Sequence, residues 1–395
     1  MKILVIHNFH RTGSASGDDQ VFKNEIAILK EYGNKVISYS AINDEFDNAS
    51  VFEKIKLFFG MFWSNKHYRA IKNICKKENP DVVHIHTFFP LISPSVLYAA
   101  KSCNCKVVAT LHDCRFVCPC ATLLRDNKLC SECGSGSYFR MIKYGCFKDS
   151  KLLSFFVACI FSYHRQKKSF YNQIDKYICL NDKQIELLIQ SGFEKSKIVK
   201  KYNFVYDVNR DFSMKESNSL PQRYVVYFGR LGEEKGIRIL MKIWNHIKDI
   251  PLVVMGGGPL KDEFEAWAAN KDNVYYLGYT EHDKCLSIVK KSEFVIFPSI
   301  CYEGCSMVEI ETMSLGKCIV ATRLGFSKEA IIDGVNGYTV PLGDIDNFVS
   351  VIVDLWNKKE LCEKMGEMAR KEYEFKYTPA DNYKQIMSIY TEIAK

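Results

Sequence analysis

Short runs rich in valine and isoleucine alternate with helix-like segments along the whole chain, and this alternation constrains the fold more than any other feature. Strands are predicted at residues 2–8, 35–40, 81–87, 106–112 and 175–180, and again at 224–230, 252–258, 274–279, 294–299 and 318–322. Buried strands separated by helices form βαβ units, and consecutive units build a parallel sheet. The sequence therefore predicts an α/β fold with two Rossmann-like, doubly wound halves and a cleft between them.

The length of the chain and one polar interruption predict two domains. A chain of 395 residues is too long for one ordinary hydrophobic core. The segment 207–222 is polar, contains a proline near its end and is typical of a linker. We therefore predict a first domain at 1–206, with a cysteine-rich insert at about 114–150, and a second domain at 223–372. The closing segment 373–395 is amphipathic and predicts a helix.

The composition narrows the class of protein. Apolar residues make up 47% of the chain and charged residues 25%, which is typical of a globular protein rather than a disordered one. The formal net charge of +8 favours anionic partners such as phosphates, acidic lipids or nucleic acid. The apolar stretch at 152–163 is too short to span a bilayer, and no signal-peptide pattern opens the chain. We expect a cytoplasmic protein.

The turn at 228–236 carries two cations among three glycines. Arg230 and Lys235 lie five residues apart, after a predicted strand and at the start of a predicted helix. Glycines let the backbone approach a ligand, and two cations can neutralise a diphosphate. A basic turn with solvated side chains explains the same residues. The glycines at 256–258 form a second such turn, which indicates either a nucleotide contact or only a tight turn.

Two acids, Glu303 and Glu311, lie eight residues apart around a turn of small residues. The turn, Gly304-Cys305-Ser306, would present backbone N–H groups at a helix start, where they favour an anion or a hydroxyl oxygen. Carboxylates accept hydrogen bonds from the hydroxyls of sugars and of ribose. Two acids at this spacing are suited to both ends of a nucleotide-sugar. We interpret Glu309, which lies between them, as an ordinary helix glutamate.

Taken together, these segments resemble the retaining glycosyltransferases of family 4, which have the GT-B fold. The resemblance rests on the two acids in E-x7-E spacing, on the turns GRLGEEKG and GGGP, and on the segments HNFHRTGSASGDDQVF, VHIHTFFPLISPSVL and TLHDCRFVCP, all in family order. It covers nearly the whole chain. It implies that the closing helix crosses back onto the first domain.

The resemblance implies a role for each matching position. Glu303 would bind hydroxyls of the donor sugar, Glu311 would bind the ribose, and Arg230 with Lys235 would bind the diphosphate. His112 would lie beside the donor sugar. The implied catalytic residues are His112, Glu303, Arg230 and Lys235, and the further donor contacts are Gly17, Gly257, Gly258, Gly278, Tyr279, Gly304, Cys305, Ser306 and Glu311. The family often has Gly-Gly where this chain has Ser16-Gly17, and Pro-Phe-Gly where this chain has Gly304-Cys305-Ser306. The second difference lies in the implied sugar pocket, so the resemblance does not identify the sugar.

Family membership also implies a reaction. The sugar would move from a nucleoside-diphosphate donor, a UDP-sugar in the first instance, to a glycan or lipid-linked acceptor with retention of configuration. A donor phosphate oxygen would take the acceptor proton, so no protein nucleophile, metal or other cofactor is implied. The cations would stabilise charge on the leaving diphosphate. We predict that Arg230→Ala or Lys235→Ala lowers turnover at least tenfold.

Histidines and cysteines raise the question of metal sites. His84 and His86 share one face of a predicted strand. They could bind a metal together, but it is commoner for one histidine to pack in the core while the other, here His86, lies at the cleft. Four cysteines have spacing that suits a structural zinc site, and these are Cys118, Cys130, Cys133 and Cys146. Buried reduced thiols, with Cys114 and Cys120 as competing ligands, are the alternative.

Two stretches, 51–77 and 137–168, mix aromatic side chains with lysine and arginine. Such segments fit peripheral binding to an anionic membrane surface, here the inner face of the cell membrane, or else core helices with cationic outer faces.

Two other functions are alternative hypotheses for the whole chain. One is a nucleotide-sugar epimerase on this fold. The other is a zinc-stabilised nucleic-acid-binding protein, but its basic residues should form one stripe, so we expect no nucleic-acid partner.

Overall fold

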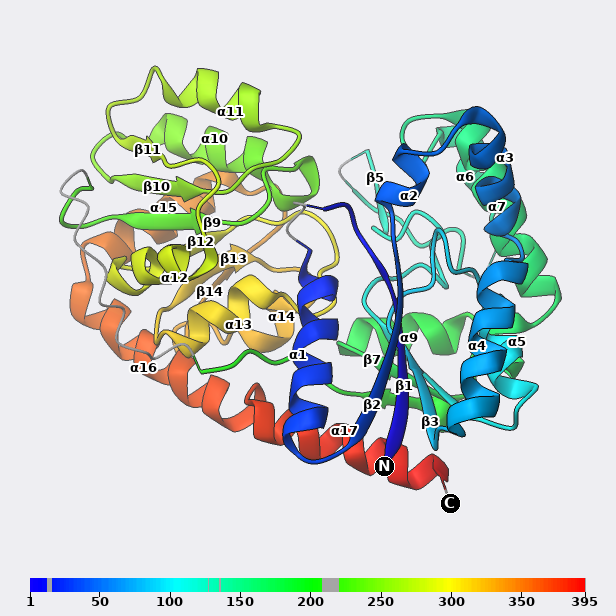
Figure 1. Cartoon of the computed structure of the whole chain (residues 1–395). Helices are drawn as coiled ribbons and strands as arrows, with labels where there is room; N and C mark the ends of the chain where they lie inside the picture. Colours follow the sequence, from blue (N-terminus) through cyan, green and yellow to red (C-terminus); the bar gives the residue numbers. More distant parts are fainter. Residues whose placement is uncertain (13–15, 127, 135, 208–219, 395) are drawn as a thin grey trace. The chain divides into compact units, whose positions relative to one another are not determined.

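The computed structural model describes the whole chain except residues 13–15, 127, 135, 208–219 and 395. Most of the predicted linker, 207–222, lies outside the described residues. The chain divides into two compact units (Figure 1). Unit 1 comprises Met1–Tyr202 together with Asn382–Lys395, and unit 2 comprises Asn203–Asp381. Each unit contains a six-stranded parallel sheet.

Unit 1 is built on the strand order β2-β1-β3-β4-β7-β8. The strands are β1 (Lys2–Phe9), β2 (Lys35–Ile42), β3 (Val82–Ile85), β4 (Lys106–Leu111), β7 (Lys176–Cys179) and β8 (Ile198–Lys200). Its helices are α1 (Gly17–Glu31), α2 (Asp44–Asp47), α3 (Val51–Gly60), α4 (Asn65–Glu78), α5 (Ser95–Lys101), α6 (Arg140–Tyr144), α7 (Lys151–Gln166), α8 (Ser169–Asn172), α9 (Asp182–Gln190), the 3-10 turn η1 (Lys195–Lys197) and most of α17 (Pro379–Ala394). A short antiparallel pair, β5 (Leu124–Arg125) and β6 (Lys128–Leu129), lies in the insert between β4 and β7.

The C-terminal helix α17 completes the core of unit 1. Its buried residues Ile386 and Tyr390 pack against Val5 of β1 and Leu29 of α1. Apolar surface removed from water in this way stabilises by roughly 25 cal/mol per Å². The predicted closing helix at 373–395 is therefore two helices, because Pro379 opens a new one.

Unit 2 has the strand order β11-β10-β9-β12-β13-β14. The strands are β9 (Val225–Phe228), β10 (Leu252–Met255), β11 (Val274–Tyr276), β12 (Val295–Phe297), β13 (Ile319–Thr322) and β14 (Gly337–Val340). Its helices are η2 (Glu233–Lys235, a 3-10 turn), α10 (Ile237–His246), α11 (Lys261–Ala268), α12 (His282–Lys291), α13 (Met307–Ser314), α14 (Ser327–Ala330), α15 (Ile345–Trp356) and α16 (Lys359–Lys376).

Helices cover both faces of the sheet of unit 2. Alternate strand residues point to opposite faces, so Val225 packs with α10, α11, α15 and α16, whereas Val226 packs with α12 and α13. Burial on both faces explains the continuous apolar runs from which the strands were predicted. The predicted fold class, two Rossmann-like doubly wound domains, is confirmed.

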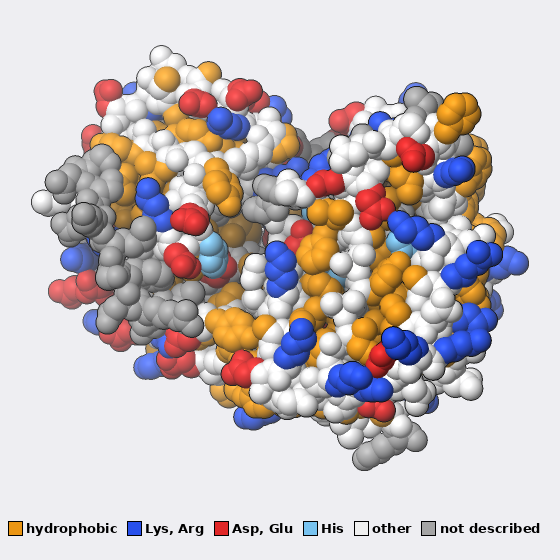
Figure 2. Space-filling model, in the orientation of Figure 1, with side chains coloured by type: hydrophobic (Ala, Val, Ile, Leu, Met, Phe, Trp, Pro, Cys, Tyr) orange, Lys and Arg blue, Asp and Glu red, His pale blue; other side chains and the backbone are white. Residues whose placement is uncertain are grey.

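Aromatic side chains are exposed on the helices around the insert of unit 1. Phe52 and Phe59 of α3 are 81% and 64% exposed, and Leu152 and Phe155 of α7 are also exposed. Phe58 of α3 contacts Phe156 of α7, with ring centroids 4.7 Å apart, which joins the two helices. Figure 2 shows hydrophobic and basic side chains together over this region, at the upper right. Among the described residues, no helix combines the length and apolar character needed to cross a bilayer.

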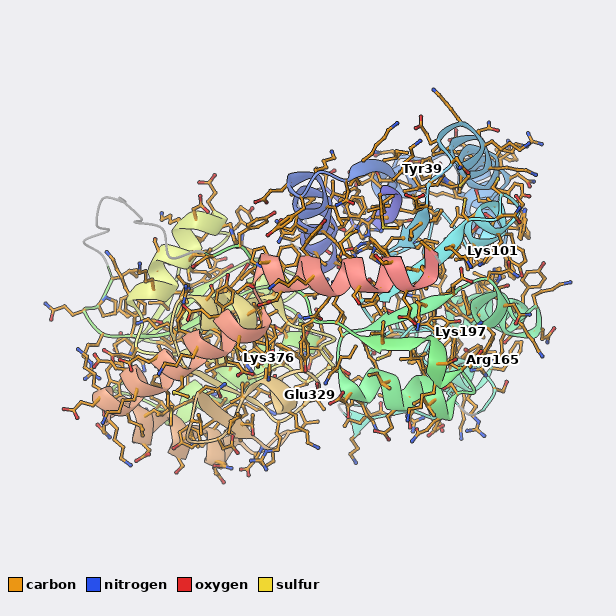
Figure 3. The ribbon with its side chains drawn as sticks, turned by 90° about the horizontal axis from the view of Figure 1, so that it is seen from below. Tyr39, Lys101, Arg165, Lys197, Glu329 and Lys376 are labelled. Atoms are coloured by element: carbon orange, nitrogen blue, oxygen red, sulfur yellow. The ribbon has the colours of Figure 1, made fainter. Side chains whose placement is uncertain are left out.

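The insert is held by Arg165 at the end of α7 (Figure 3). Its guanidinium donates to the carbonyl oxygens of Cys133, Gly134 and Gly136, at 3.2, 3.1 and 2.6 Å. It also lies 3.6 Å from the centroid of the Tyr138 ring. Hydrogen bonds from this half-buried cation to three backbone carbonyl oxygens therefore hold the insert against α7.

Candidate active site

The strand order of unit 2 reverses between β9 and β12. The chain runs from β9 outward to β10 and β11, and then returns to place β12 on the other side of β9. In doubly wound sheets, ligands bind at the carboxyl ends of the strands at such a reversal. The segments that leave β9 and β12 here are 229–236 and 298–306. They contain Arg230, Lys235 and Glu303.

A glycine allows these two segments to touch. Gly236 has φ of +74°, and a Cβ atom at this position would lie 1.8 Å from the carbonyl oxygen of Pro298. The Ser299 hydroxyl and the Ile300 N–H both donate to the carbonyl oxygen of Glu234, at 3.1 and 3.0 Å. The turn after β9 is thereby fixed against the segment after β12.

Lys235 and Glu303 form an ion pair at this junction. The distance from Lys235 Nζ to Glu303 Oε1 is 2.7 Å, and the Ser299 hydroxyl donates to the same oxygen at 2.8 Å. Burial alone would raise the pKa of Glu303, but the ammonium of Lys235 and these hydrogen bonds hold it below its ordinary value. Burial would likewise lower the pKa of Lys235, yet the Glu303 carboxylate raises it. Both groups are therefore charged at neutral pH.

Arg230 is the more exposed cation of the turn. Its side chain is 53% exposed, and its guanidinium lies 3.5 Å from the carboxylate of Glu234. An exposed pair of this kind contributes little to stability. Arg230 can therefore turn to a ligand at small cost.

The helix α13 carries the second acid. Ser306 caps the helix, because its hydroxyl accepts from the N–H of Glu309 at 3.4 Å. Glu311 is largely buried, and its Oε1 lies 2.9 Å from Nε2 of His282 at the start of α12. Hydrogen bonding to Glu311 raises the pKa of His282. His282 was not predicted from the sequence, because 29 residues separate it from Glu311.

The turn before α13 is packed rather than open. Cys305 is buried, and its carbonyl oxygen accepts from the amide of Asn203 at 3.0 Å. Gly325 packs so closely that a Cβ there would lie 2.8 Å from the carbonyl oxygen of Glu303. The conformation of Gly304-Cys305-Ser306 is therefore fixed by the Asn203 side chain and by the close approach of Gly325.

Glu309 is not the ordinary helix glutamate that we predicted. Its side chain is fully buried, and neither carboxylate oxygen has a hydrogen-bond partner among the described residues. Burial raises the pKa of Glu309 to about 8, although the hydroxyls of Ser327 and Ser306 lie close enough to oppose this. The helix is buried on nearly all sides from Glu309 to Ser314. Helical spacing distinguishes a buried face only when the opposite face is exposed, so it could not predict the burial of Glu309.

The glycine turn after β10 contains two structural glycines and one open one. A Cβ at Gly256 would lie 1.8 Å from the carbonyl oxygen of Gly229, and one at Gly258 would lie 2.5 Å from that of Leu231. Gly257, by contrast, has nothing within 4 Å of that position. The turn after β11 is also open, since Gly278 has no close neighbour and the Tyr279 side chain is exposed.

In unit 1 the strand order reverses between β1 and β3. Gly17 opens α1 after β1, and His86 and His112 follow β3 and β4. A pocket at the ends of β3 and β4 is lined by His86, His112 and the aromatic rings of Phe88 and Phe116, among others. Burial lowers the pKa of His112 to about 4, so its imidazole is neutral at pH 7. His112 and Gly17 thus lie in unit 1, and the other predicted site residues lie in unit 2.

The structure does not support the predicted zinc site. Two groups of three or more ligand atoms within 4.8 Å of one another occur among the described residues. They are Glu25-His84-His86 and His10-Asp18-Asp19, and neither contains a cysteine. The insert thiols interact with one another instead, and a hydrogen bond from Cys120 lowers the pKa of Cys118 to about 7. The spacing of Cys118, Cys130, Cys133 and Cys146 therefore predicted a tetrahedral site that the structure does not support.

Comparison with known proteins gives one consistent family. The family model for group 1 glycosyl transferases matches residues 209–372, and that for glycosyltransferase family 4 matches residues 48–207. An uncharacterised glycosyltransferase of Methanocaldococcus jannaschii is 25% identical over 379 residues, which cover 94% of this chain and 93% of that protein. The O-antigen chain mannosyltransferase C of Escherichia coli is 22% identical over 84% of this chain and 80% of its own length.

Solved structures show the same fold. The HepE protein of Anabaena, crystallised with UDP and glucose, superposes with a TM-score of 0.68 at 16% identity, over 99% of this chain and all of that one. Two consecutive family models, one relative matched along 93% of its length and two parallel six-stranded sheets agree with one another. The chain belongs to the family 4 type of GT-B glycosyltransferases and is a transferase enzyme.

Proposed function

We propose that this enzyme transfers a sugar from a UDP-sugar to a saccharide or lipid-linked acceptor, with retention of anomeric configuration. One observation carries the donor part of the proposal. The Lys235–Glu303 ion pair joins the segments after β9 and β12 at the strand reversal of unit 2. HepE, which shares the fold, was crystallised with UDP and with UDP-glucose, and this supports a uridine donor.

Each side chain has one task in this reaction. Lys235 has three N–H donors, so it can hold Glu303 and still donate to a diphosphate. Arg230 presents a planar fork of donors to the same group. Glu303 accepts hydrogen bonds from sugar hydroxyls, and Glu311 accepts them from the ribose.

The chemistry then needs no protein nucleophile. The bond between the anomeric carbon and the diphosphate oxygen breaks, and the acceptor oxygen bonds to that carbon on the same face. The acceptor proton passes to the departing diphosphate. Negative charge grows on the diphosphate as the bond breaks, and Arg230 and Lys235 stabilise that charge more in the transition state than in the ground state.

Glu311→Gln is expected to raise the donor KM about tenfold and to change kcat less. The carboxylate oxygens bind ribose hydroxyls in the ground and transition states alike, and a charge-assisted hydrogen bond contributes about 1.5–3 kcal/mol. Initial rates at varied donor concentration measure the effect. Glu265→Gln, at an exposed position on α11, is the matched control. An unchanged KM in Glu311→Gln would remove Glu311 from the donor site.

The decisive experiment is a donor panel. Purified protein is incubated with UDP-, GDP-, ADP- and dTDP-sugars, with and without a lipid-linked saccharide, and nucleoside diphosphate release is followed. The proposal expects release from a UDP-sugar that depends on the acceptor, and a glycoside product with the donor's anomeric configuration. Epimerised donor without transfer would support the epimerase instead. Inverted product would contradict retention.

The exposed aromatic side chains suit a lipid-linked acceptor. Phe52 and Phe59 of α3 and Leu152 and Phe155 of α7 form an apolar surface. Exposed lysines occur on the same helices and on α6, and these are Lys56, Lys151 and Lys143. Aromatic rings beside lysines are typical of segments that enter the headgroup region of anionic membranes. We propose that this surface binds the membrane that carries the acceptor.

Flotation with liposomes tests that surface. The protein is expected to float with vesicles that contain anionic lipid, and less so with neutral vesicles or at high salt. The variant Phe52→Ser/Phe59→Ser should lose at least tenfold in bound fraction, because two exposed rings no longer enter the bilayer. Phe375→Ser, at an equally exposed phenylalanine of α16, should bind as the wild type does. Failure to float with anionic vesicles would refute the membrane surface.

A further inference from the structure

A buried charge network lies beneath the pocket that His112 lines in unit 1. Glu25 of α1 is its centre, and it is fully buried. One carboxylate oxygen lies 2.9 Å from Nδ1 of His84 and 3.2 Å from Nε2 of His86, and the other lies 3.2 Å from Nζ of Lys201. Lys201 is itself buried and donates to Asn382 at 3.2 Å. The catalytic scheme above uses none of these four groups.

The surroundings of Glu25 and His86 determine which groups of this network are charged. Burial would raise the pKa of Glu25, but Lys201, His84 and His86 hold it well below its ordinary value. Burial lowers the pKa of His86 well below its ordinary value, more than Glu25 raises it. Glu25 and Lys201 are therefore an ion pair, and His86 is neutral. A neutral imidazole carries its proton on one nitrogen only.

Hydrogen bonding fixes which nitrogen that is. Nε2 of His86 faces an ionised carboxylate, which can only accept, so Nε2 carries the proton. Nδ1 of His86 is then an acceptor, and it lies 3.0 Å from Nε2 of His112. His112 must donate through Nε2, which leaves its Nδ1 as an acceptor. Asp18, Glu25 and Asp113 favour a charged His112, while His7 and burial oppose it, and burial is the largest effect.

We propose that Glu25 and His86 are positioning residues that hold His112 in its Nε2–H tautomer, so that Nδ1 accepts a hydrogen bond from a sugar hydroxyl. This inference rests on the proposed transfer reaction, in which His112 contacts the sugar. Tyr390 and Thr110 complete the support, because they contact Nδ1 and Nε2 of His84 at 2.7 and 2.8 Å. The C-terminal helix α17 thereby takes part in orienting the sugar-binding histidine.

The first test is spectroscopic and independent of activity. The full-length protein, labelled with ¹⁵N in its nine histidines, is examined by imidazole NMR, which distinguishes protonated from bare ring nitrogens. His112→Gln identifies the His112 signals. The expected result at pH 7 is a protonated Nε2 and a bare Nδ1 in His112, changed to a mixture in His86→Phe. The opposite tautomer in the wild type would overturn the proposal.

The same spectra examine a metal ion as the alternative occupant. Glu25, His84 and His86 could act as ligands, but the ammonium of Lys201 already holds the carboxylate. Zinc chloride added at stoichiometric amounts should leave the His84 and His86 signals in place. Zinc-dependent shifts of both residues would overturn the positioning role.

The second test uses donors altered at single hydroxyls. If Nδ1 of His112 accepts from a hydroxyl, then replacing that hydroxyl by hydrogen or by fluorine lowers kcat/KM about equally, roughly tenfold, because neither can donate. His86→Phe should lower kcat/KM of the intact donor similarly and hardly affect the deoxy donor. His86→Gln, which can donate to Glu25 and accept from His112, should restore most of the rate. A fluorinated donor that reacts like the intact one, at every position, would contradict the acceptor role. If no donor reacts at all, the proposed transfer fails while the NMR result stands.

Discussion

Lys235→Met is expected to lower kcat about a hundredfold, well beyond the tenfold limit predicted from the sequence. Removing one fixed donor from a developing anion costs about 10²–10³ in rate, and the charge on a leaving diphosphate grows only as the bond breaks. The donor KM should change less than kcat for the same reason. Steady-state kinetics with the donor found in the panel measure both constants.

The Lys235 variant needs two controls. Its loss leaves Glu303 without the ammonium that lowers its pKa, so thermal unfolding must show that the protein still folds. Lys242→Met makes the same change at an exposed position of α10 and should keep wild-type kinetics. Lys235→Arg should recover only part of the rate, because a planar fork does not replace a compact ammonium. Wild-type kinetics in both Lys235→Met and Arg230→Ala would remove the diphosphate site from this turn.

Glu309→Gln is expected to stabilise the protein, and increasingly so as the pH rises. The folded-state pKa of about 8 lies above the ordinary value of 4.5, so the folded state binds a proton that the unfolded state has released. The stability of the wild type therefore falls between about pH 4.5 and pH 8. A glutamine does not titrate, so the variant does not lose this stability. At pH 8 its free energy of unfolding should exceed that of the wild type by an amount on the order of 3–5 kcal/mol.

Urea unfolding from pH 5 to pH 8.5 measures this difference. At pH 5 the variant and the wild type should have similar free energies of unfolding. Glu309 is then protonated in the folded state, and pH 5 lies so near its ordinary pKa of 4.5 that protonating it on folding costs little free energy. Glu367→Gln on α16, at an exposed position, should parallel the wild type at every pH. A constant offset between Glu309→Gln and the wild type across this range would show that Glu309 does not titrate as its burial implies.

The sequence predicted the fold because strand burial leaves a strong pattern. Runs such as that of β10 are apolar on both faces, and each is followed by a helix. Two strands of the parallel sheets, β8 and β14, escaped prediction for physical reasons. The strand β8 has only three residues, and β14 begins with a glycine and mixes tyrosine and threonine with one valine. Neither offers enough apolar surface to be distinguished from a loop.

The sequence predicted part of the candidate site for a related reason. Residues that follow parallel strands lie at one edge of the sheet, so Lys235 and Glu303 were expected on the same side, and an ion pair joins them. Contacts between distant helices leave no such pattern. The partners of Glu311 and Glu25, which are His282 and Lys201, lie far along the chain and became apparent only from the fold.

Two site predictions rested on local spacing alone, and the structure supports neither of them. The cysteine spacing resembled a zinc site, but in the described part of the chain no cysteine belongs to a group of three or more ligand atoms within 4.8 Å of one another. Glu309 resembled a surface glutamate, but α13 is enclosed by neighbouring elements and buries it. Spacing along a chain sets which ligands could meet, whereas packing of the whole unit decides whether they do.

A crystal structure with the bound donor examines the proposed donor site most directly. We predict that the diphosphate lies within hydrogen-bond distance of Arg230 and Lys235, that the ribose hydroxyls bond to Glu311, and that the sugar bonds to Glu303. A nucleotide-sugar bound elsewhere, with these four side chains untouched, would contradict the account.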